Sequence, residues 1–235
     1  MSHLFDLIRR MTPPIHKEGF VFIYIFAGAT VLLGLLSNAL GWIGTILTMW
    51  CVYFFRNPDR YTPEGDTLII SPADGVVSSI QDVALPKELG RSEDELFTRI
   101  SIFLSVFDVH VNRVPATGEI VDLHYNPGKF LSADLDKASE VNERQTVLMK
   151  AKTGEDICFV QIAGLVARRI LCDLEEKQVV KAGERFGIIR FGSRMDVYLP
   201  KGVATNVIVG QRAVGGETVL ADLKIKGDAI KGEVR

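Results

Sequence analysis

The most apolar part of the chain lies near its N-terminus, where residues 19–55 contain no Asp, Glu, Lys, Arg or His. As a single helix this segment would measure about 55 Å, which exceeds a hydrocarbon core of about 30 Å. The middle of the segment, Ser-Asn-Ala-Leu-Gly at residues 37–41, holds its most turn-like residues. The pattern therefore predicts two short helices, at about residues 19–36 and 40–55, that form a hairpin.

Basic residues flank this hairpin on both sides, with Arg9, Arg10 and Lys17 before it and Arg56 and Arg60 after it. Because Lys and Arg are enriched on the cytoplasmic side of membrane segments, we expect both ends of the hairpin in the cytoplasm. We interpret residues 1–55 as an anchor in the cell membrane, with the rest of the chain on the cytoplasmic side. Each helix is short for a full span, so a re-entrant or interfacial hairpin is an alternative. A helical pair buried in a domain core is another.

From residue 56 onward the pattern changes to short apolar and β-branched segments. These are residues 67–70, 75–80, 99–106, 157–162, 187–191, 196–199 and 206–209. Turn-forming residues separate them, and short strands at this spacing are typical of β-sandwiches and barrels. The sequence predicts a mainly β (α+β) domain over residues 56–235 with a sandwich or barrel-like architecture. The turn sequences at residues 71–77 and 180–184 resemble the hairpins of lipoyl-type folds.

Composition narrows the possible functions. The 27 Lys and Arg residues against 29 Asp and Glu residues give a net charge of −2, which argues against a nucleic-acid partner. The three cysteines have no metal-type spacing, so we expect no metal site, and their number suits a reducing compartment. The mean hydropathy of +0.19 reflects the N-terminal segment.

One candidate for chemistry follows the apolar segment at residues 99–106. If that strand continues, Asp108, His110 and Asn112 lie on one face, because alternate residues of a strand point the same way. A carboxylate beside an imidazole is suited to proton transfer near neutral pH. A polar strand end that faces solvent is the alternative.

A second candidate is Gly192-Ser193, the only Gly-Ser dipeptide in the chain. Covalent geometry places Ser193 Oγ where it can attack the Gly192 carbonyl carbon, and glycine leaves that carbonyl accessible. Asp74, in the turn at residues 71–75, is a third candidate, although Asp is also a common turn former. When each of these two segments is taken alone, an ordinary turn explains it and no function is needed.

Taken together and in this order, these segments resemble the phosphatidylserine decarboxylases, and in particular their short form. The resemblance covers about residues 56–222. It includes Phe-Arg-Asn-Pro at residues 55–58, Ser-Pro-Ala-Asp-Gly at 71–75, Asp-Val-His-Val-Asn-Arg-Val-Pro at 108–115, Tyr-Asn-Pro-Gly-Lys-Phe at 125–130, Asn-Glu-Arg at 142–144 and Phe-Gly-Ser-Arg at 191–194. Each segment is short, but their joint order is specific.

The resemblance implies a self-processing enzyme with a covalent pyruvoyl cofactor. Cleavage between Gly192 and Ser193 would give a β chain of residues 1–192 and an α chain of residues 193–235, and Ser193 would become the pyruvoyl group. Asp74, His110 and Ser193 are implied as the processing triad. The enzyme would convert phosphatidylserine in the bilayer to phosphatidylethanolamine and CO₂, through a Schiff base between the substrate amine and the pyruvoyl group. The family also implies a homodimer of processed αβ units.

Further residues are candidates for substrate binding. Arg113 or Arg194 could hold the lipid phosphate or the substrate carboxylate, a task that suits a guanidinium group. Asn112 and Asp108 lie beside His110 in the sequence, and Phe130 could form part of an apolar lip for the acyl chains.

The chain departs from the longer members of this family at Arg113, where those members carry a second histidine. A division of labour between two histidines therefore does not transfer. Either His110 serves both processing and decarboxylation, or Asp74 or Asp108 takes one role. Two other functions stay open: decarboxylation of a different serine phospholipid, such as archaetidylserine, and a non-catalytic, membrane-anchored adaptor or carrier module of the lipoyl-like kind.

Overall fold

The computed structural model describes residues 13–128, 141–164, 169–190 and 193–227, together with Ile230 and Gly232. The chain divides into two compact units, Met1–Asp59 and Arg60–Arg235. Each unit is described by itself.

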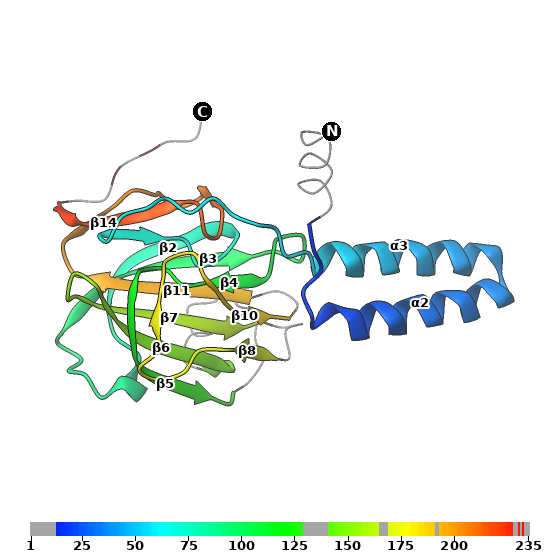
Figure 1. Ribbon diagram of the computed structural model, residues 1–235, viewed down its shortest axis with the longest axis horizontal. Coiled ribbons are helices and arrows are strands. Elements are labelled where there is room, and N and C mark those ends of the chain that lie inside the picture. Colours follow the sequence, from blue (N-terminus) through cyan, green and yellow to red (C-terminus); the bar gives the residue numbers. More distant parts are fainter. Residues whose placement is uncertain are drawn as a thin grey trace. The chain divides into compact units, whose positions relative to one another are not determined.

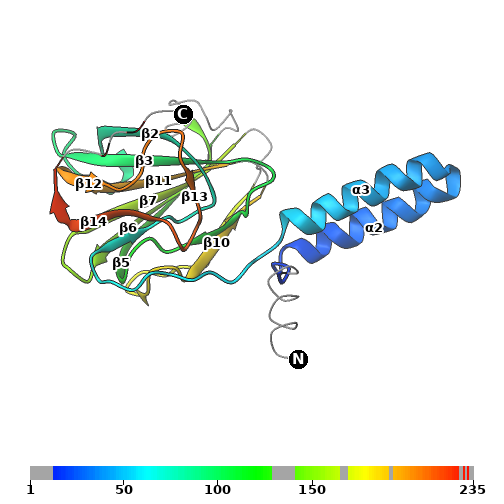
Figure 2. The same cartoon turned by 90° about the horizontal axis from the view of Figure 1, so that it is seen from above.

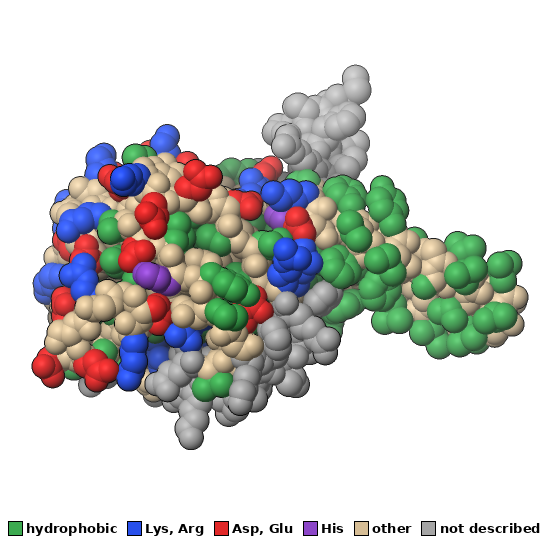
Figure 3. Space-filling view, turned by 90° about the horizontal axis from the view of Figure 1, so that it is seen from below, with side chains coloured by type: hydrophobic (Ala, Val, Ile, Leu, Met, Phe, Trp, Pro, Cys, Tyr) green, Lys and Arg blue, Asp and Glu red, His purple; other side chains and the backbone are tan. Residues whose placement is uncertain are grey.

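The first unit contains two apolar helices, as the hydrophobic pattern predicts. Helix α2 spans Gly19–Leu36 and helix α3 spans Asn38–Phe54, so that Ser37 alone separates them. Of the two, α2 is long and apolar enough to cross a membrane, with a mean hydropathy of 2.3, and only 6% of it is buried within the protein. Apolar side chains cover the visible face of this hairpin (Figure 3). An apolar surface of this kind suits a lipid environment.

Small residues let the two helices approach closely. Thr30 Oγ1 lies 2.9 Å from Thr48 Oγ1, which is a hydrogen bond between the helices. A Cβ atom at Gly44 would lie 2.7 Å from Thr30 Oγ1, and one at Gly41 would lie 3.0 Å from the Cα of Gly34. Glycine and threonine at a helix contact are typical of packing in membranes, where close backbone approach replaces the hydrophobic effect.

The second unit is mainly β, which confirms the predicted fold class. Its elements are β1 (Leu68–Ile70), β2 (Gly75–Ala84), the short 3-10 helix η1 (Lys87–Leu89), β3 (Leu96–Leu104), β4 (Val111–Arg113), β5 (Gly118–Asn126), β6 (Arg144–Ala151), β7 (Asp156–Ala163), β8 (Ile170–Cys172), β9 (Val179–Val180), β10 (Arg185–Ile189), β11 (Ser193–Pro200), β12 (Val203–Thr205), β13 (Arg212–Ala213) and β14 (Val219–Lys226).

Eight strands form one sheet in the order β13-β2-β3-β11-β7-β6-β5-β9. This sheet curls into half a barrel (Figures 1 and 2). Two smaller sheets accompany it, β1-β14-β12 and β4-β10-β8. Neighbouring strands pair antiparallel in all three sheets.

The two faces of strand β11 are both buried, against different groups of side chains. Met195, Val197 and Leu199 join the larger apolar core. Tyr198 packs into a second, smaller apolar cluster together with Cys158 of β7. Because side chains alternate along a strand, Ser193 belongs to the face of Met195, and Arg194 belongs to the opposite face.

The strand over residues 99–106 does not continue toward Asn112. Strand β3 ends at Leu104, and a turn follows in which Asp108 accepts the backbone N–H of Ser105 at 2.8 Å and returns its own N–H to the Ser105 oxygen at 2.9 Å. Strand β4 then pairs with β10 in a different sheet. The apolar run predicted the strand, but the side chain of Asp108 closes a turn that ends it.

Candidate active site

Ser193 opens β11, a central strand of the eight-stranded sheet. It is fully buried and pairs with Leu104 of β3 on one side and with Ala163 of β7 on the other. Among the residues that the structure describes, none forms a hydrogen bond with Ser193 Oγ. A buried hydroxyl without a partner costs about 1–3 kcal/mol, so the stability of the fold does not explain a serine at this position.

The strand register brings Asp74 to the same end of the sheet as Ser193. Asp74 directly precedes β2, where Val76 pairs with Phe103 of β3, and Phe103 pairs in turn with Arg194 of β11. Strand β3 lies between β2 and β11, and neighbouring strands are about 4.8 Å apart. The strands that follow Asp74 and begin at Ser193 are thus about 10 Å apart.

The carboxylate of Asp74 is held by an ion pair and by the main chain. Arg60 Nη2 donates to its two oxygens at 2.7 and 3.0 Å, and the backbone N–H of Gly215 donates at 2.8 Å. Gly215 packs so closely here that a Cβ atom would lie 2.9 Å from the carbonyl carbon of Ala73. These contacts fix the orientation of the Asp74 carboxylate.

His110 is fully buried and lies between the end of β3 and the start of β4. Its Nδ1 lies 3.0 Å from the backbone oxygen of Asp108. Since a carbonyl oxygen can only accept, Nδ1 carries the hydrogen, and in the neutral ring Nε2 is the nitrogen that can take up a proton. The backbone oxygen of His110 accepts the N–H of Ile189, four residues before Ser193.

The carboxylate of Asp108 has a different role from the one the sequence suggests. It closes the turn with Ser105 and forms an ion pair with Arg212 of β13. Asp108 is almost completely buried, whereas Arg212 is largely exposed. Asp108 therefore orients His110 through its main chain, and its side chain ties the turn to the edge of the sheet.

Asn112 and Arg113 of β4 form hydrogen bonds with other residues of the protein. Asn112 Oδ1 accepts a hydrogen bond from Gln161 Nε2 at 2.9 Å. Arg113 donates from Nη1 to the backbone oxygen of Gly183 at 2.7 Å, and its own backbone N–H donates to Pro72 at 2.8 Å. Strand β4 is thereby attached to the turn that carries Asp74.

Arg194 lies on the opposite face of β11 from Ser193. Its guanidinium forms a two-pronged ion pair with Asp196, with both N–O distances at 2.9 Å. The side chains are 2% and 0% exposed. Two close contacts in a buried ion pair hold both side chains in place. This geometry favours a structural role for Arg194.

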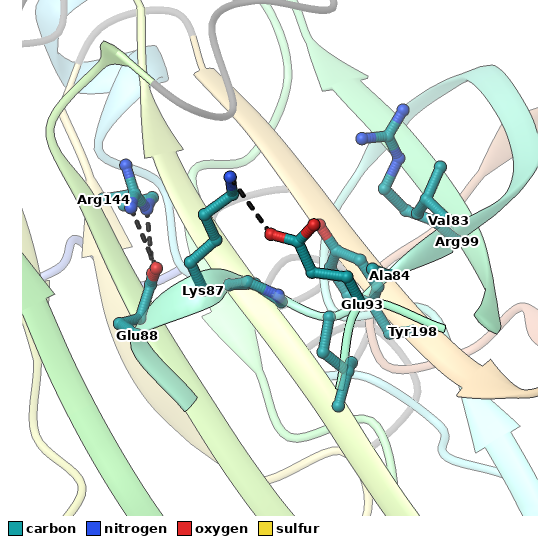
Figure 4. A pocket seen from close by; sticks show the side chains of 10 residues that line it. Val83, Ala84, Lys87, Glu88, Glu93, Arg99, Arg144 and Tyr198 are labelled. Carbon is teal, nitrogen blue, oxygen red and sulfur yellow. Dashed lines mark hydrogen bonds and ion pairs between the residues drawn. The ribbon is translucent and has the colours of Figure 1, made fainter. Parts of the chain in front are cut away.

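A cavity of about 590 Å³ lies on this same face, beneath η1. Its lining includes Glu88, Arg99, Arg144 and Tyr198 (Figure 4). Tyr198 lies an odd number of residues after Ser193 on β11, so their side chains point to opposite faces of the sheet. The cavity and the Ser193 side chain are therefore on opposite sides of the sheet. Burial raises the pKa of Tyr198, and the negative charge of Asp196 adds to this effect.

Four hydrogen bonds hold the carboxylate of Glu88 in this cavity. It accepts hydrogen bonds from Arg144 Nε and Nη2, both at 2.9 Å, from Thr146 at 2.7 Å and from Asn126 at 3.0 Å. Burial alone would raise the pKa of Glu88, but the hydrogen bonds from Arg144 and Thr146 outweigh it and lower the pKa to about 2. The cavity is therefore lined by a preformed ion-pair network.

Two of the residues predicted from the sequence, Gly192 and Phe130, lie outside the described residues. Three others were not found from the sequence: Arg60, Arg212 and Gln161. Arg60 was noted only as a flanking charge of the apolar segment. Nothing in the local pattern around Arg212 or Gln161 marks them, because their partners lie 104 and 49 residues away in the chain.

Comparison with known proteins places the chain in one family. A family model described as phosphatidylserine decarboxylase matches residues 47–221. The phosphatidylserine decarboxylase proenzyme of Rickettsia bellii (strain OSU 85-389) is 59% identical over 215 residues, which cover 92% of this chain and 93% of that protein. The proenzyme of the same name from Rickettsia akari (strain Hartford) is 60% identical over 208 residues, which cover 88% and 90% of the two chains. The chain described here belongs to the phosphatidylserine decarboxylase family.

Proposed function

We propose that this chain is the proenzyme of a pyruvoyl-dependent phosphatidylserine decarboxylase, which converts phosphatidylserine to phosphatidylethanolamine and CO₂. The family match over residues 47–221 supports this activity. The observation that carries the assignment to a residue is that Ser193, which directly follows Gly192, has a buried hydroxyl with no hydrogen-bond partner among the described residues. A site built only for stability would satisfy that hydroxyl or replace it with a methyl group.

Ser193 fits the precursor of the cofactor. Its hydroxyl is free of competing hydrogen bonds from the described residues, and its strand is fixed by neighbours on both sides. A pyruvoyl group at the start of β11 would supply an electron sink for the electrons that CO₂ leaves behind on the substrate α-carbon. The surrounding residues bind and orient the substrate and move protons.

We assign self-cleavage to the bond between Gly192 and Ser193. Attack of Ser193 Oγ on the preceding carbonyl carbon converts the peptide bond to an ester, and elimination at the serine then separates the chains and releases the Gly192 carboxylate. Water replaces the nitrogen of the resulting dehydroalanine, which leaves as ammonia, and the pyruvoyl group remains. The products are a β chain of residues 1–192 and an α chain of 43 residues, 193–235. The attack requires a base for the hydroxyl proton, and the elimination requires a base for the Cα proton.

His110 is the proposed proton-transfer group. Its Nδ1–H is committed to the Asp108 carbonyl, so Nε2 is the atom that accepts and returns a proton. Asp74 completes the proposed triad at the same end of the sheet, where Arg60 and Gly215 hold its carboxylate. With a single histidine in this segment, we assign to His110 both the processing step and the return of a proton to the substrate α-carbon.

The remaining predicted residues divide by their surroundings. Arg113 is buried beside the Asp74 turn, and we retain it as the candidate for the lipid phosphate. Asp108 acts on His110 through its main chain. Arg194 forms an ion pair with Asp196, so its proposed role is to hold the start of strand β11 in place. Phe130 stays a candidate for acyl-chain contact.

The apolar helix α2 is consistent with membrane association. The substrate has two acyl chains and stays in the bilayer, so an anchor raises its local concentration at the enzyme. We propose that residues 1–55 form this anchor at the cell membrane, with the β unit on the cytoplasmic side. We also propose that the processed αβ units assemble as a homodimer.

Denaturing electrophoresis with intact-mass analysis tests the proposal. The purified wild-type chain should separate into two fragments that part after Gly192, and a carbonyl reagent should label the 43-residue fragment. The variant Ser193→Ala should remain one chain and release no CO₂ from phosphatidylserine vesicles. Ser101→Ala is the matched control, because Ser101 is also a fully buried serine whose Oγ has no partner among the described residues, and it lies on the opposite face of the sheet. An uncut wild-type chain, or normal cleavage of Ser193→Ala, contradicts the assignment.

A further inference from the structure

Asn112 and Gln161 form a buried pair of amides that joins two sheets. Asn112 belongs to β4 in the sheet β4-β10-β8, and Gln161 belongs to β7 in the eight-stranded sheet. Both side chains are fully buried, and Gln161 Nε2 donates to Asn112 Oδ1 at 2.9 Å. We call these two side chains the amide pair.

The neighbours of the amide pair fix which atoms are nitrogen and which are oxygen. Gln161 Nε2 also lies 3.3 Å from the backbone oxygen of Leu171. A carbonyl oxygen can only accept, so the atom that faces it must be the NH₂ group of Gln161. Asn112 must then turn its oxygen toward Gln161, as it does.

This orientation leaves one donor and one acceptor without a partner. Among the described residues, no group forms a hydrogen bond with Asn112 Nδ2 or with Gln161 Oε1, although both atoms are buried. Each unpartnered atom lowers the stability of the fold, whereas two apolar side chains of the same shape would avoid that cost. A donor and an acceptor left in this state on two hydrogen-bonded side chains favour a site for a bound ligand.

The amide pair lies beside Ser193. On strand β7, Gln161 pairs with Met195 of β11, and Ala163 pairs with Ser193. Ser193, Met195 and Gln161 therefore share one face of the sheet, and Ser193 is a diagonal neighbour of Gln161, for which Cα atoms are typically about 7–8 Å apart. Asn112 in turn follows His110 by two residues in the chain. The pair thus adjoins Ser193 in the sheet and lies two residues from His110 along the chain.

We propose that the amide pair is the subsite for the amino-acid part of the substrate head group. The serine head group carries a carboxylate, which only accepts hydrogen bonds, and an amine, which donates them. Asn112 Nδ2 matches the carboxylate, and Gln161 Oε1 matches the amine. This inference rests on the proposed decarboxylase function and adds Gln161 as a binding residue.

The neutrality of the amides suits a decarboxylation. A guanidinium would bind the carboxylate tightly in the ground state, and that binding is lost as CO₂ forms, so it would add to the barrier. An uncharged donor orients the carboxylate with less ground-state stabilisation, because hydrogen bonds between a charged and a neutral group are weaker than ion pairs with the same geometry. The amide pair provides orientation without a buried positive charge of its own.

The decisive variant is Asn112→Asp, which is nearly the same size as the wild type. It keeps the oxygen that accepts from Gln161 and replaces only the free donor Nδ2 with an oxygen. We expect self-cleavage at the wild-type level on denaturing gels and a rise in KM for phosphatidylserine of about tenfold or more. Gln145→Met is the matched control, because Gln145 is a buried neighbour of Gln161 on β6 whose amide bonds to the main chain of Thr146.

A second variant, Asn112→Leu with Gln161→Met, removes both unpartnered atoms. We expect its Tm to equal or exceed that of the wild type, its self-cleavage to be retained, and its kcat/KM to fall at least as far as in Asn112→Asp. Should this double variant not fold, Asn112→Asp decides alone.

Two results overturn the inference. An unchanged KM in folded Asn112→Asp means that the pair is only a structural link between sheets. Loss of self-cleavage in both variants means that the pair serves maturation rather than head-group binding. If the wild type itself neither cleaves nor releases CO₂, the proposed function fails, and that result is distinct from a difference between variant and wild type.

Discussion

The Nδ1 atom of His110 lies 3.0 Å from the backbone oxygen of Asp108, so a main-chain contact fixes the tautomer of the imidazole. This relationship depends on the turn that ends β3, in which the Asp108 side chain binds Ser105 and Arg212. A main-chain acceptor is neutral and does not change with pH. It selects one tautomer of His110 and contributes no charge of its own.

Replacement of Asp108 by Asn should therefore lower the stability of the fold and leave the pH dependence of decarboxylation unchanged. Asn can still accept the Ser105 N–H, but it loses the ion pair with Arg212, so we expect the free energy of unfolding to fall by about 1–2 kcal/mol. The pH profile of decarboxylation should keep the wild-type shape, because the acceptor for His110 is unchanged. Urea titration and the pH dependence of kcat measure the two effects. A displaced pH profile would show that the carboxylate acts on His110 directly.

The ion pair between Arg194 and Asp196 predicts that variants of these residues change the stability of the fold and not the binding of substrate. Arg194→Met alone leaves the Asp196 carboxylate buried without this partner, and we expect a loss of about 3–5 kcal/mol in unfolding free energy. The double variant Arg194→Met with Asp196→Leu should recover most of that loss. Its KM for phosphatidylserine should match the wild type, since Arg194 lies on the face opposite Ser193. A raised KM in the stable double variant would instead assign substrate binding to Arg194.

The hydrogen-bonded Glu88 predicts how stability changes in acid. Its pKa of about 2 in the folded chain lies below the ordinary value of 4.5. Ionised Glu88 therefore stabilises the fold above pH 4.5, and this contribution is lost as the pH falls toward 2. The difference corresponds to about 3 kcal/mol at neutral pH. Glu88→Gln should flatten the fall in unfolding free energy over this range.

The control for that measurement is Glu93→Gln, since Glu93 lines the same cavity but is 74% exposed and pairs with Lys87, which is 82% exposed. Urea titrations of both variants and of the wild type at pH 7 and pH 3 give the comparison. Equal acid sensitivity in Glu88→Gln and the wild type contradicts the role given to Glu88.

The helical hairpin predicts a steric test. A side chain at Gly44 would meet Thr30, including its Cα at 3.0 Å, whereas a Cβ atom at Gly28 meets nothing within 4 Å. Gly44→Val should force α2 and α3 apart, and Gly28→Val should not. Cysteines placed at Thr30 and Thr48, in a chain whose native cysteines are replaced by serine, report the separation by their rate of disulfide formation. We expect at least a tenfold slower rate with Gly44→Val, and equal rates in the two glycine variants would show that the helices do not pack along this line.

Several features follow from local sequence alone. An uncharged run of residues 19–55 is too long for one span and contains one turn-like stretch, which fixes two helices and their break at Ser37. Short apolar and β-branched segments between turn formers predict the mainly β fold. These signals are local, because backbone propensity and burial act over a few neighbouring residues.

Tertiary structure decided how the site residues are connected. From the sequence, Asp108, His110 and Asn112 would share one face if the strand continued, but a turn follows Leu104, and each of the three residues has a different partner. Arg212, Gly215 and Gln161 reach Asp108, Asp74 and Asn112 across 104, 141 and 49 residues of chain. Such contacts depend on strand order and register. A shift of one residue in register would move every side chain of the strand to the other face. The sequence determined which residues carry the chemistry of this family, and only the packing of the sheets decided which of their atoms are committed to the fold and which are left for a ligand.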